Sequence, residues 1–212
     1  YTTDILNCRA NLVIEAIVEK LSAKISLFQQ LEEMNPINTI FASNTSSISI
    51  QQIAHELEHP SRFAGMHFFN PAPIMKLVEI VQGEETNDQV ISLLEAICRK
   101  MGKTPVVCKD SPGFIVNRVA RHYYLESMQI LQEGETDLAT IDKLLEASGF
   151  KMGPFKLMDL IGMDINYSVS NIVWEALGKP ERLQPSSIQK QKVEAGELGR
   201  KTGKGFYLYE RP

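Results

Sequence analysis

The chain has 212 residues, of which 43% are hydrophobic and 23% are charged, and its formal net charge is −4 at pH 7. That length permits one large globular domain or two modest ones. The acidic balance argues against nucleic acid or a membrane surface as a partner, because both require clusters of Lys and Arg. No apolar run reaches the roughly 18 residues that a membrane helix needs.

The first half of the sequence alternates between strand and helix patterns. Apolar and β-branched runs predict strands at residues 12–16, 39–42, 63–68, 77–81 and 104–108. Helical spacing or capping residues predict helices at 21–31, 49–57 and 88–101. This alternation is typical of a doubly wound α/β sheet.

After residue 109 the pattern becomes helical. Residues 114–133 form one long helical stretch, and Asp137 is placed to cap a second helix that runs through Ala147. A third long helix is predicted from Asp159 onward, and the last strand pattern is a short one at 205–209. We therefore expect an α/β part over residues 1–109 and an all-α part over residues 110–212.

Three cysteines, Cys8, Cys98 and Cys108, are scattered without a CxxC spacing. This set predicts reduced, buried thiols in a reducing compartment such as the cytoplasm. The histidines His55, His59 and His122 lie in polar helical contexts, which favours surface residues, so we expect no metal site.

The segment Ser43-Asn44-Thr45-Ser46-Ser47 follows a predicted strand and precedes a helix. Loops at this place in α/β sheets contact ligands. The same hydroxyl and amide groups also serve as helix caps, and Ser47 or Ser49 could be one. The pattern alone leaves both interpretations open.

His67 lies on a predicted strand, and Glu79 lies on the next one. An imidazole group titrates near neutral pH and can take a proton from an alcohol, and a carboxylate on the other ring nitrogen would fix its tautomer. Taken alone, however, the pattern favours a core histidine that is bonded to a backbone carbonyl. The glycine-rich segment 199–205 does not fit a phosphate-loop motif, and we interpret it as a solvated basic turn.

Several motifs together resemble the L-3-hydroxyacyl-CoA dehydrogenase family in order and spacing. They are FASNTSS (41–47), RFAGMHFFNP (62–71), MKLVE (75–79), KDSPGFIVNR (109–118), MGPF (152–155) and KTGKGFY (201–207). The resemblance covers nearly the whole chain. It implies the C-terminal part of a Rossmann-type NAD-binding domain followed by a helical domain. It also implies NAD-dependent oxidation of a 3-hydroxyacyl-CoA to the 3-ketoacyl-CoA, or the reverse reduction, and a homodimer formed through the helical domain.

The resemblance also assigns roles to individual residues. His67 would be the base that takes the proton of the C3 hydroxyl group, and Glu79 would orient it. Ser46 and Asn117 would bond the substrate oxygen.

Four further positions match residues around this site in the family. Asn70 would link the neighbourhood of His67 to Glu19. Glu19, Lys24 and Asn44 would line the cofactor side.

The sequence departs from the family in one respect, because it contains no GxGxxG motif to hold the dinucleotide pyrophosphate. Residue 1 would lie just before the fourth strand of the expected sheet, so about 60 to 100 residues would be missing at about 30 per βαβ unit. We therefore expect the 212-residue chain alone to bind NAD poorly and to turn over little. Micromolar affinity in an NADH titration would contradict this expectation.

Two alternative functions compete with this interpretation. One is a related dehydrogenase of free hydroxy acids, although Phe68 and Phe69 fit the acyl-CoA branch better. The other is a non-catalytic dimerisation or acyl-CoA-binding remnant, which the missing glycine motif favours. The joint presence of Ser46, His67 and Glu79 argues against a remnant.

Overall fold

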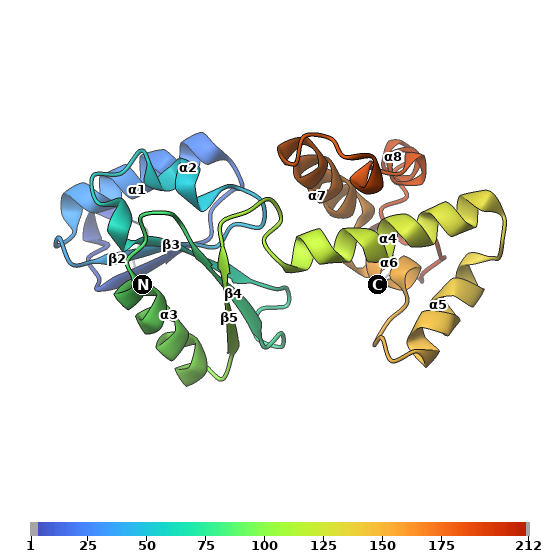
Figure 1. Cartoon of the computed structure of the whole chain (residues 1–212), viewed down its shortest axis with the longest axis horizontal. Helices are drawn as coiled ribbons and strands as arrows, with labels where there is room; N and C mark the ends of the chain where they lie inside the picture. The colour runs from blue at the N-terminus through green and yellow to red at the C-terminus, as the bar shows by residue number, and fades with distance from the viewer. Residues whose placement is uncertain (1–3, 211–212) are drawn as a thin grey trace. The chain divides into compact units, whose positions relative to one another are not determined.

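The structure, a computed structural model, describes residues 4–210. The chain divides into two compact units between Ile115 and Val116, later than the expected boundary near residue 109. Unit 1 is the α/β part that ends at Ile115, and unit 2 is the helical part that begins at Val116 (Figure 1). Among the described residues, no helix is long and apolar enough to cross a membrane.

Unit 1 contains a five-stranded sheet whose strands are ordered as in the chain. The strands are β1 (Leu12–Glu15), β2 (Ile40–Ser43), β3 (Phe63–Phe68), β4 (Leu77–Gln82) and β5 (Thr104–Lys109). The helices are α1 (Leu21–Met34), α2 (Ile50–Ala54) and α3 (Asp88–Lys100). All five predicted strands are therefore present, with ends within two residues of the predicted ones.

The sheet is mixed rather than wholly parallel. β1, β2 and β3 run parallel, but β4 runs antiparallel to β3, and β5 runs parallel to β4. The connection at 69–76 explains the reversal, because a parallel return needs a crossover of about a dozen residues or more. The reversal places His67 directly opposite Glu79.

Both faces of this sheet are covered by helices (Figure 1). Alternate residues of a strand point to opposite faces, so neighbouring residues enter different cores. Phe41 and Phe63 pack with α1 and α2, whereas Ala42 and Ala64 pack with α3. By the same alternation, His67 and Glu79 face the side of α1 and α2.

Unit 2 is built from helices around its own core. The helices are α4 (Val116–Glu133), α5 (Leu138–Ala147), α6 (Pro154–Ile161), α7 (Met163–Ala176) and α8 (Ser187–Glu194). Asp137 caps α5, as predicted, by accepting a hydrogen bond from the Thr140 amide. The long helix predicted from Asp159 onward is wrong, because Gly162 adopts φ 102° and divides α6 from α7. Side chains favour such a positive φ only rarely, and glycine adopts it freely.

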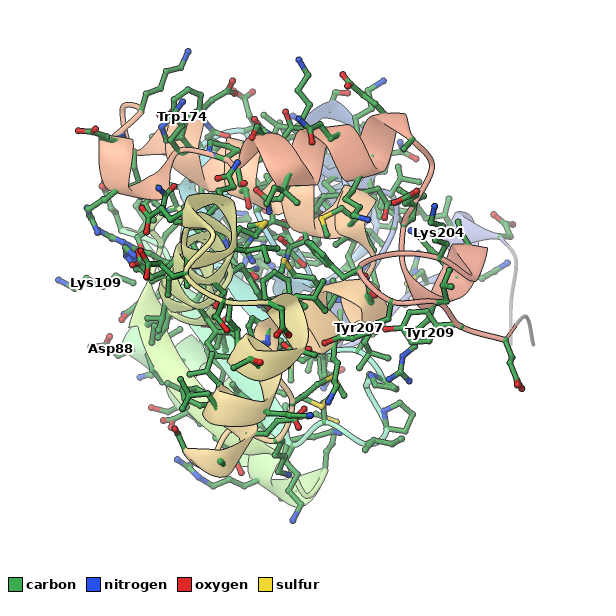
Figure 2. All side chains as sticks on the ribbon, turned by 90° about the vertical axis from the view of Figure 1, so that its right-hand side faces the viewer. Asp88, Lys109, Trp174, Lys204, Tyr207 and Tyr209 are labelled. Atoms are coloured by element: carbon green, nitrogen blue, oxygen red, sulfur yellow. The ribbon has the colours of Figure 1, made fainter. Side chains whose placement is uncertain are left out.

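The end of the described chain is held by Asp159 rather than by a sheet. Residues 205–209 form no strand, and only isolated bridges occur, at Gly199–Lys204 and Lys204–Leu208. The Asp159 carboxylate accepts bonds from the Phe206 and Tyr207 amides at 2.9 Å and from the Tyr209 hydroxyl at 3.0 Å. Figure 2 labels Lys204, Tyr207 and Tyr209 on this segment. The interpretation of 199–205 as a solvated turn is therefore wrong at Gly205, which is buried against Asp159.

Candidate active site

His67 and Glu79 form a buried pair on β3 and β4. The His67 Nδ1 atom lies 2.8 Å from Glu79 Oε2, and the two residues are 4% and 1% exposed. An ionised carboxylate can only accept hydrogen bonds, so Nδ1 carries the proton and donates it. The other ring nitrogen, Nε2, is then left as an acceptor.

Ser46 lies at this second nitrogen. Its Oγ is 3.1 Å from His67 Nε2. Ser46 follows β2 in the loop that precedes α2, so the ends of two parallel strands bring these side chains together. The structure thus brings Ser46 and His67, to which the resemblance gives roles at one substrate, within hydrogen-bonding distance of each other.

Aromatic rings surround the histidine. The ring of Phe69 lies 4.5 Å from that of His67, and the ring of Phe114 lies 5.8 Å away. The Ile115 amide donates to Glu79 Oε1 at 3.0 Å, which holds the second carboxylate oxygen in place. An imidazole in this setting is shielded from water on the side of these rings and is oriented by an ionised partner.

Glu19 organises the Ser46 loop. Its Oε1 accepts bonds from Thr45 Oγ1 at 2.6 Å, from the Ser46 amide at 3.0 Å and from Ser47 Oγ at 3.0 Å. Burial by itself would raise the pKa of Glu19, but these hydrogen bonds and the charge of Lys24 hold it below its ordinary value. Glu19 therefore remains an anion that fixes the loop.

Lys24 is completely buried and is paired with two carboxylates. Its Nζ lies 2.6 Å from Glu15 Oε1 and 3.5 Å from Glu19 Oε2. Glu15 also accepts a bond from Ser43 Oγ at 2.6 Å, so one acidic residue ties the ends of β1 and β2 together. The sequence analysis missed Glu15, although a carboxylate inside an apolar strand pattern is a signal for a buried ion pair.

Asn44 makes a hydrogen bond beside the histidine, whereas Asn70 does not make the contact with Glu19 that the resemblance implies. The Asn44 side-chain oxygen accepts a bond from the Phe68 amide at 2.9 Å, next to the histidine. Asn70 is exposed after β3, and within residues 4–210 no hydrogen bond joins it to Glu19. Glu19 bonds instead to its nearer neighbours in the 45–47 loop.

Asn117 belongs to unit 2 and lies in the first turn of α4. Its backbone oxygen accepts a bond from Arg121 Nε at 3.0 Å. Its role at a substrate remains a prediction from the resemblance.

Two other features of unit 1 lie outside this chemistry. Burial and the carboxylates of Glu79 and Asp110 raise the pKa of Cys108 to about 12, so this thiol stays protonated and is no nucleophile. A polar cavity of about 410 Å³ has none of the predicted site residues in its wall. Its lining is Gln51, Gln82, Gly83, Glu84, Lys109 and Asp110.

Comparison with known proteins identifies the family. Residues 1–111 match the NAD-binding domain of 3-hydroxyacyl-CoA dehydrogenases, and residues 113–209 match the C-terminal domain of the same enzymes. The chain belongs to the 3-hydroxyacyl-CoA dehydrogenase family. Its first domain is therefore of the NAD-binding type, and its two units correspond closely to the two domains of the family.

Individual relatives of the family are similar over nearly the whole chain. The chain is 49% identical over 199 residues to the 3-hydroxyadipyl-CoA dehydrogenase of Escherichia coli, covering 93% of the chain and 42% of that protein. It is 42% identical over 201 residues to the mitochondrial hydroxyacyl-coenzyme A dehydrogenase of Mus musculus, covering 94% of the chain and 64% of that protein. The chain thus spans about half the length of the curated relatives that it matches.

A solved structure agrees with this assignment. The crystal structure of 3-hydroxybutyryl-CoA dehydrogenase from Escherichia coli K12 matches with a TM-score of 0.96 at 47% identity. The match covers 100% of this chain and 46% of that one. A 3-hydroxyacyl-CoA dehydrogenase fold thus accounts for both units.

Proposed function

We propose that the protein to which this chain belongs oxidises an L-3-hydroxyacyl-CoA to the 3-ketoacyl-CoA with NAD, or performs the reverse reduction. The observation that carries the proposal is the chain of contacts from Glu79 through His67 to Ser46, at 2.8 and 3.1 Å. Family membership supports the substrate class, because the relatives are named as dehydrogenases of such thioesters.

His67 acts as the base in this proposal. The C3 hydroxyl proton must leave as the hydride leaves C3, and Nε2 is the unprotonated nitrogen that can receive it. Glu79 stabilises the imidazolium that forms, and Ser46 Oγ, next to Nε2, is placed to bond the substrate oxygen. In the direction of reduction, the same nitrogen returns the proton.

NAD, when bound, supplies the hydride acceptor. The polar groups at the carboxyl ends of β1 and β2 fit such a ligand, because α/β sheets bind nucleotides at this edge. Glu19 presents a carboxylate that is 37% exposed there, which suits ribose hydroxyl groups. Lys24, in contrast, is completely buried, so we assign it to holding Glu15 and Glu19 rather than to direct contact.

We further infer a cytoplasmic homodimer that pairs through unit 2. Large apolar side chains on this unit support the pairing, since they are solvent-exposed in the single chain. They include Leu144, Phe150, Leu160 and Ile165, which are 65%, 52%, 49% and 50% exposed. Light scattering tests the inference, and a monomer at high concentration would contradict it.

The activity is tested in the complete protein by following NADH consumption with acetoacetyl-CoA. We expect turnover with this thioester and no reduction of NAD by a free sugar acid in a parallel assay, which separates the proposal from a dehydrogenase of free hydroxy acids. The variant His67→Gln should lose about 10²- to 10⁴-fold in kcat. Full activity of this variant would instead support a non-catalytic remnant.

A further inference from the structure

Arg121 is a buried arginine without an acidic partner. It is 3% exposed on α4, and burial lowers its pKa to about 10, so it remains charged at neutral pH. Among residues 4–210, no Asp or Glu forms an ion pair with it. The guanidinium lies over the Tyr124 ring at 5.0 Å, but no carboxylate balances its charge as is usual for a buried charge.

Neutral groups satisfy only part of the guanidinium. Nε donates to the Asn117 carbonyl oxygen at 3.0 Å, and Nη1 donates to the Asn166 carbonyl oxygen at 3.0 Å and to Ser170 Oγ at 2.9 Å. These bonds use three of the five N–H groups that an arginine carries. The described residues form no hydrogen bond with Nη2, which is not among the fully buried atoms without a partner.

A second donor lacks a partner in the same cluster. Asn166 is 1% exposed, and its Nδ2 has no hydrogen-bond partner among the described residues. Its Oδ1 is already bonded to Gln189 Nε2 at 2.6 Å, so the side chain is held with Nδ2 left over. A carboxylate suits an unpaired amide donor beside a positive charge, because its oxygens accept hydrogen bonds from both groups.

The position of this cluster relates it to the substrate. Arg121 follows Asn117 by one helical turn, so the two side chains share a face of α4. One turn advances about 5.4 Å along the helix axis. In a six-carbon acyl chain, the three bonds from C3 to C6 span about 3.8 Å, as three backbone bonds do. A carboxylate at C6 would reach the next turn when Asn117 contacts the oxygen at C3.

We propose that Arg121 and Asn166 bind the terminal carboxylate of a 3-hydroxydicarboxyl-CoA substrate. This inference rests on the proposed function and on the place of Asn117 at the substrate oxygen, which the resemblance implies. An acyl chain of equal length that ends in a methyl group would offer no acceptor to Nη2 or to Asn166 Nδ2, and a site built for hydrogen bonds rejects such an analogue.

Equilibrium binding to the complete protein tests the proposal without turnover. Calorimetry would compare 3-hydroxyadipyl-CoA with 3-hydroxyhexanoyl-CoA, which has the same number of carbons and no terminal carboxylate. We expect the dicarboxyl thioester to bind at least about tenfold more tightly. Equal affinity would overturn the proposal, whereas failure to reduce acetoacetyl-CoA in the separate assay would overturn the proposed activity.

Two variants assign the preference to this cluster. Arg121→Met should reduce the affinity ratio to about one. Asn166→Asp places a carboxylate beside the guanidinium and should also abolish the preference, while it relieves the unpaired charge and preserves folding. The second variant keeps the test decisive if Arg121→Met does not fold.

Arg182→Met is the matched control. Arg182 is an exposed arginine of the same unit, and its Nη1 lies 3.4 Å from His122 Nε2. The control should keep the ratio of the wild type. If Arg121→Met and Asn166→Asp weaken both thioesters equally, the cluster only holds α4 to α7 and the proposal is wrong.

Discussion

The two units treat their buried charges in opposite ways. In unit 1, Lys24 pairs with Glu15, and His67 pairs with Glu79. In unit 2, the buried charged groups Arg121, Asp142 and Asp159 are bonded mainly to backbone groups, hydroxyls and tyrosines. Opposite charges balance the buried groups of unit 1, whereas neutral partners hold those of unit 2 in place.

Asp142 illustrates the second mode. It is completely buried, and its carboxylate accepts bonds from the Phe155 and Lys156 amides at 2.9 and 3.2 Å, at the start of α6. The Tyr207 hydroxyl donates to the same carboxylate at 2.7 Å. An acid at a helix N-terminus is stabilised by the free amides and by the helix dipole, so it needs no cation.

The largest effect is expected from replacing an ion pair of unit 1 by a neutral pair. Glu79→Gln keeps the shape of the side chain but removes the charge that faces the imidazolium. We expect kcat to fall by about 10²- to 10⁴-fold with a small change in thermal stability. Ser46→Ala serves as the comparison, because it removes the hydroxyl group at Nε2 and leaves the charge of Glu79 in place. Unchanged kcat in Glu79→Gln would show that neutral partners suffice at this site.

Lys24→Met should mainly affect stability. It leaves the Glu15 carboxylate buried without its cation, which costs about 3 to 5 kcal/mol in the free energy of unfolding. The double variant Glu15→Gln/Lys24→Met should recover much of that loss, because no charge then remains buried. Urea unfolding of the two variants measures the difference, and equal losses would exclude the unpaired carboxylate as the cause.

Asp159→Asn is the matching change in unit 2. The amide oxygen of Asn can replace one carboxylate oxygen as an acceptor. The NH₂ group then takes the place of Oδ2 and faces two other donors, the Tyr207 amide and the Tyr209 hydroxyl. We expect a loss of about 3 kcal/mol in the free energy of unfolding. Tyr209→Phe removes one of these bonds and should cost about 1 kcal/mol. A larger loss in Tyr209→Phe than in Asp159→Asn would show that the Tyr209 hydroxyl, rather than the amide bonds to the carboxylate, holds the segment.

The sequence predicted the local elements of unit 1 better than their pairing. Apolar runs bounded by turn residues located all five strands, and Ser49 proved to be the cap of α2. The direction of β4 depends on the length and path of 69–76, which local propensity does not encode. The contact of His67 with Glu79 was implied by the resemblance, because the pattern alone favoured a core histidine bonded to a backbone carbonyl.

Unit 2 was harder to predict because its breaks depend on single residues. Gly162 was overlooked as a helix break within an apolar stretch, and α8 was missed although Ser186 and Gln189 form a capping box. Arg121 gave no signal, since an arginine on a helical pattern is normally solvated. Its burial follows from tertiary packing against Asn166 and Ser170, which the sequence alone does not specify.

The smallest effect is expected from an ion pair on unit 2, which tests whether paired charges matter there at all. Glu197 lies 2.6 Å from Lys192 Nζ and 2.5 Å from Lys204 Nζ. Hydrogen bonds from these two lysines lower the pKa of Glu197 from 4.5 to about 2. Because the folded pKa is depressed, the pair stabilises the fold fully above pH 4.5 and loses this contribution as the pH falls toward about 2.

Glu197→Gln should therefore flatten the fall of stability across that acid range, with a modest loss at neutral pH. Urea unfolding at several pH values measures this slope. Glu194→Gln is the control, since Glu194 is 65% exposed and lies 3.8 Å from Lys190. Exposed pairs contribute little, so the control should keep the wild-type slope. The same slope in Glu197→Gln would mean that the contacts of Glu197 with Lys192 and Lys204 add nothing to the free energy of unfolding. Neutral partners alone would then hold the C-terminal segment.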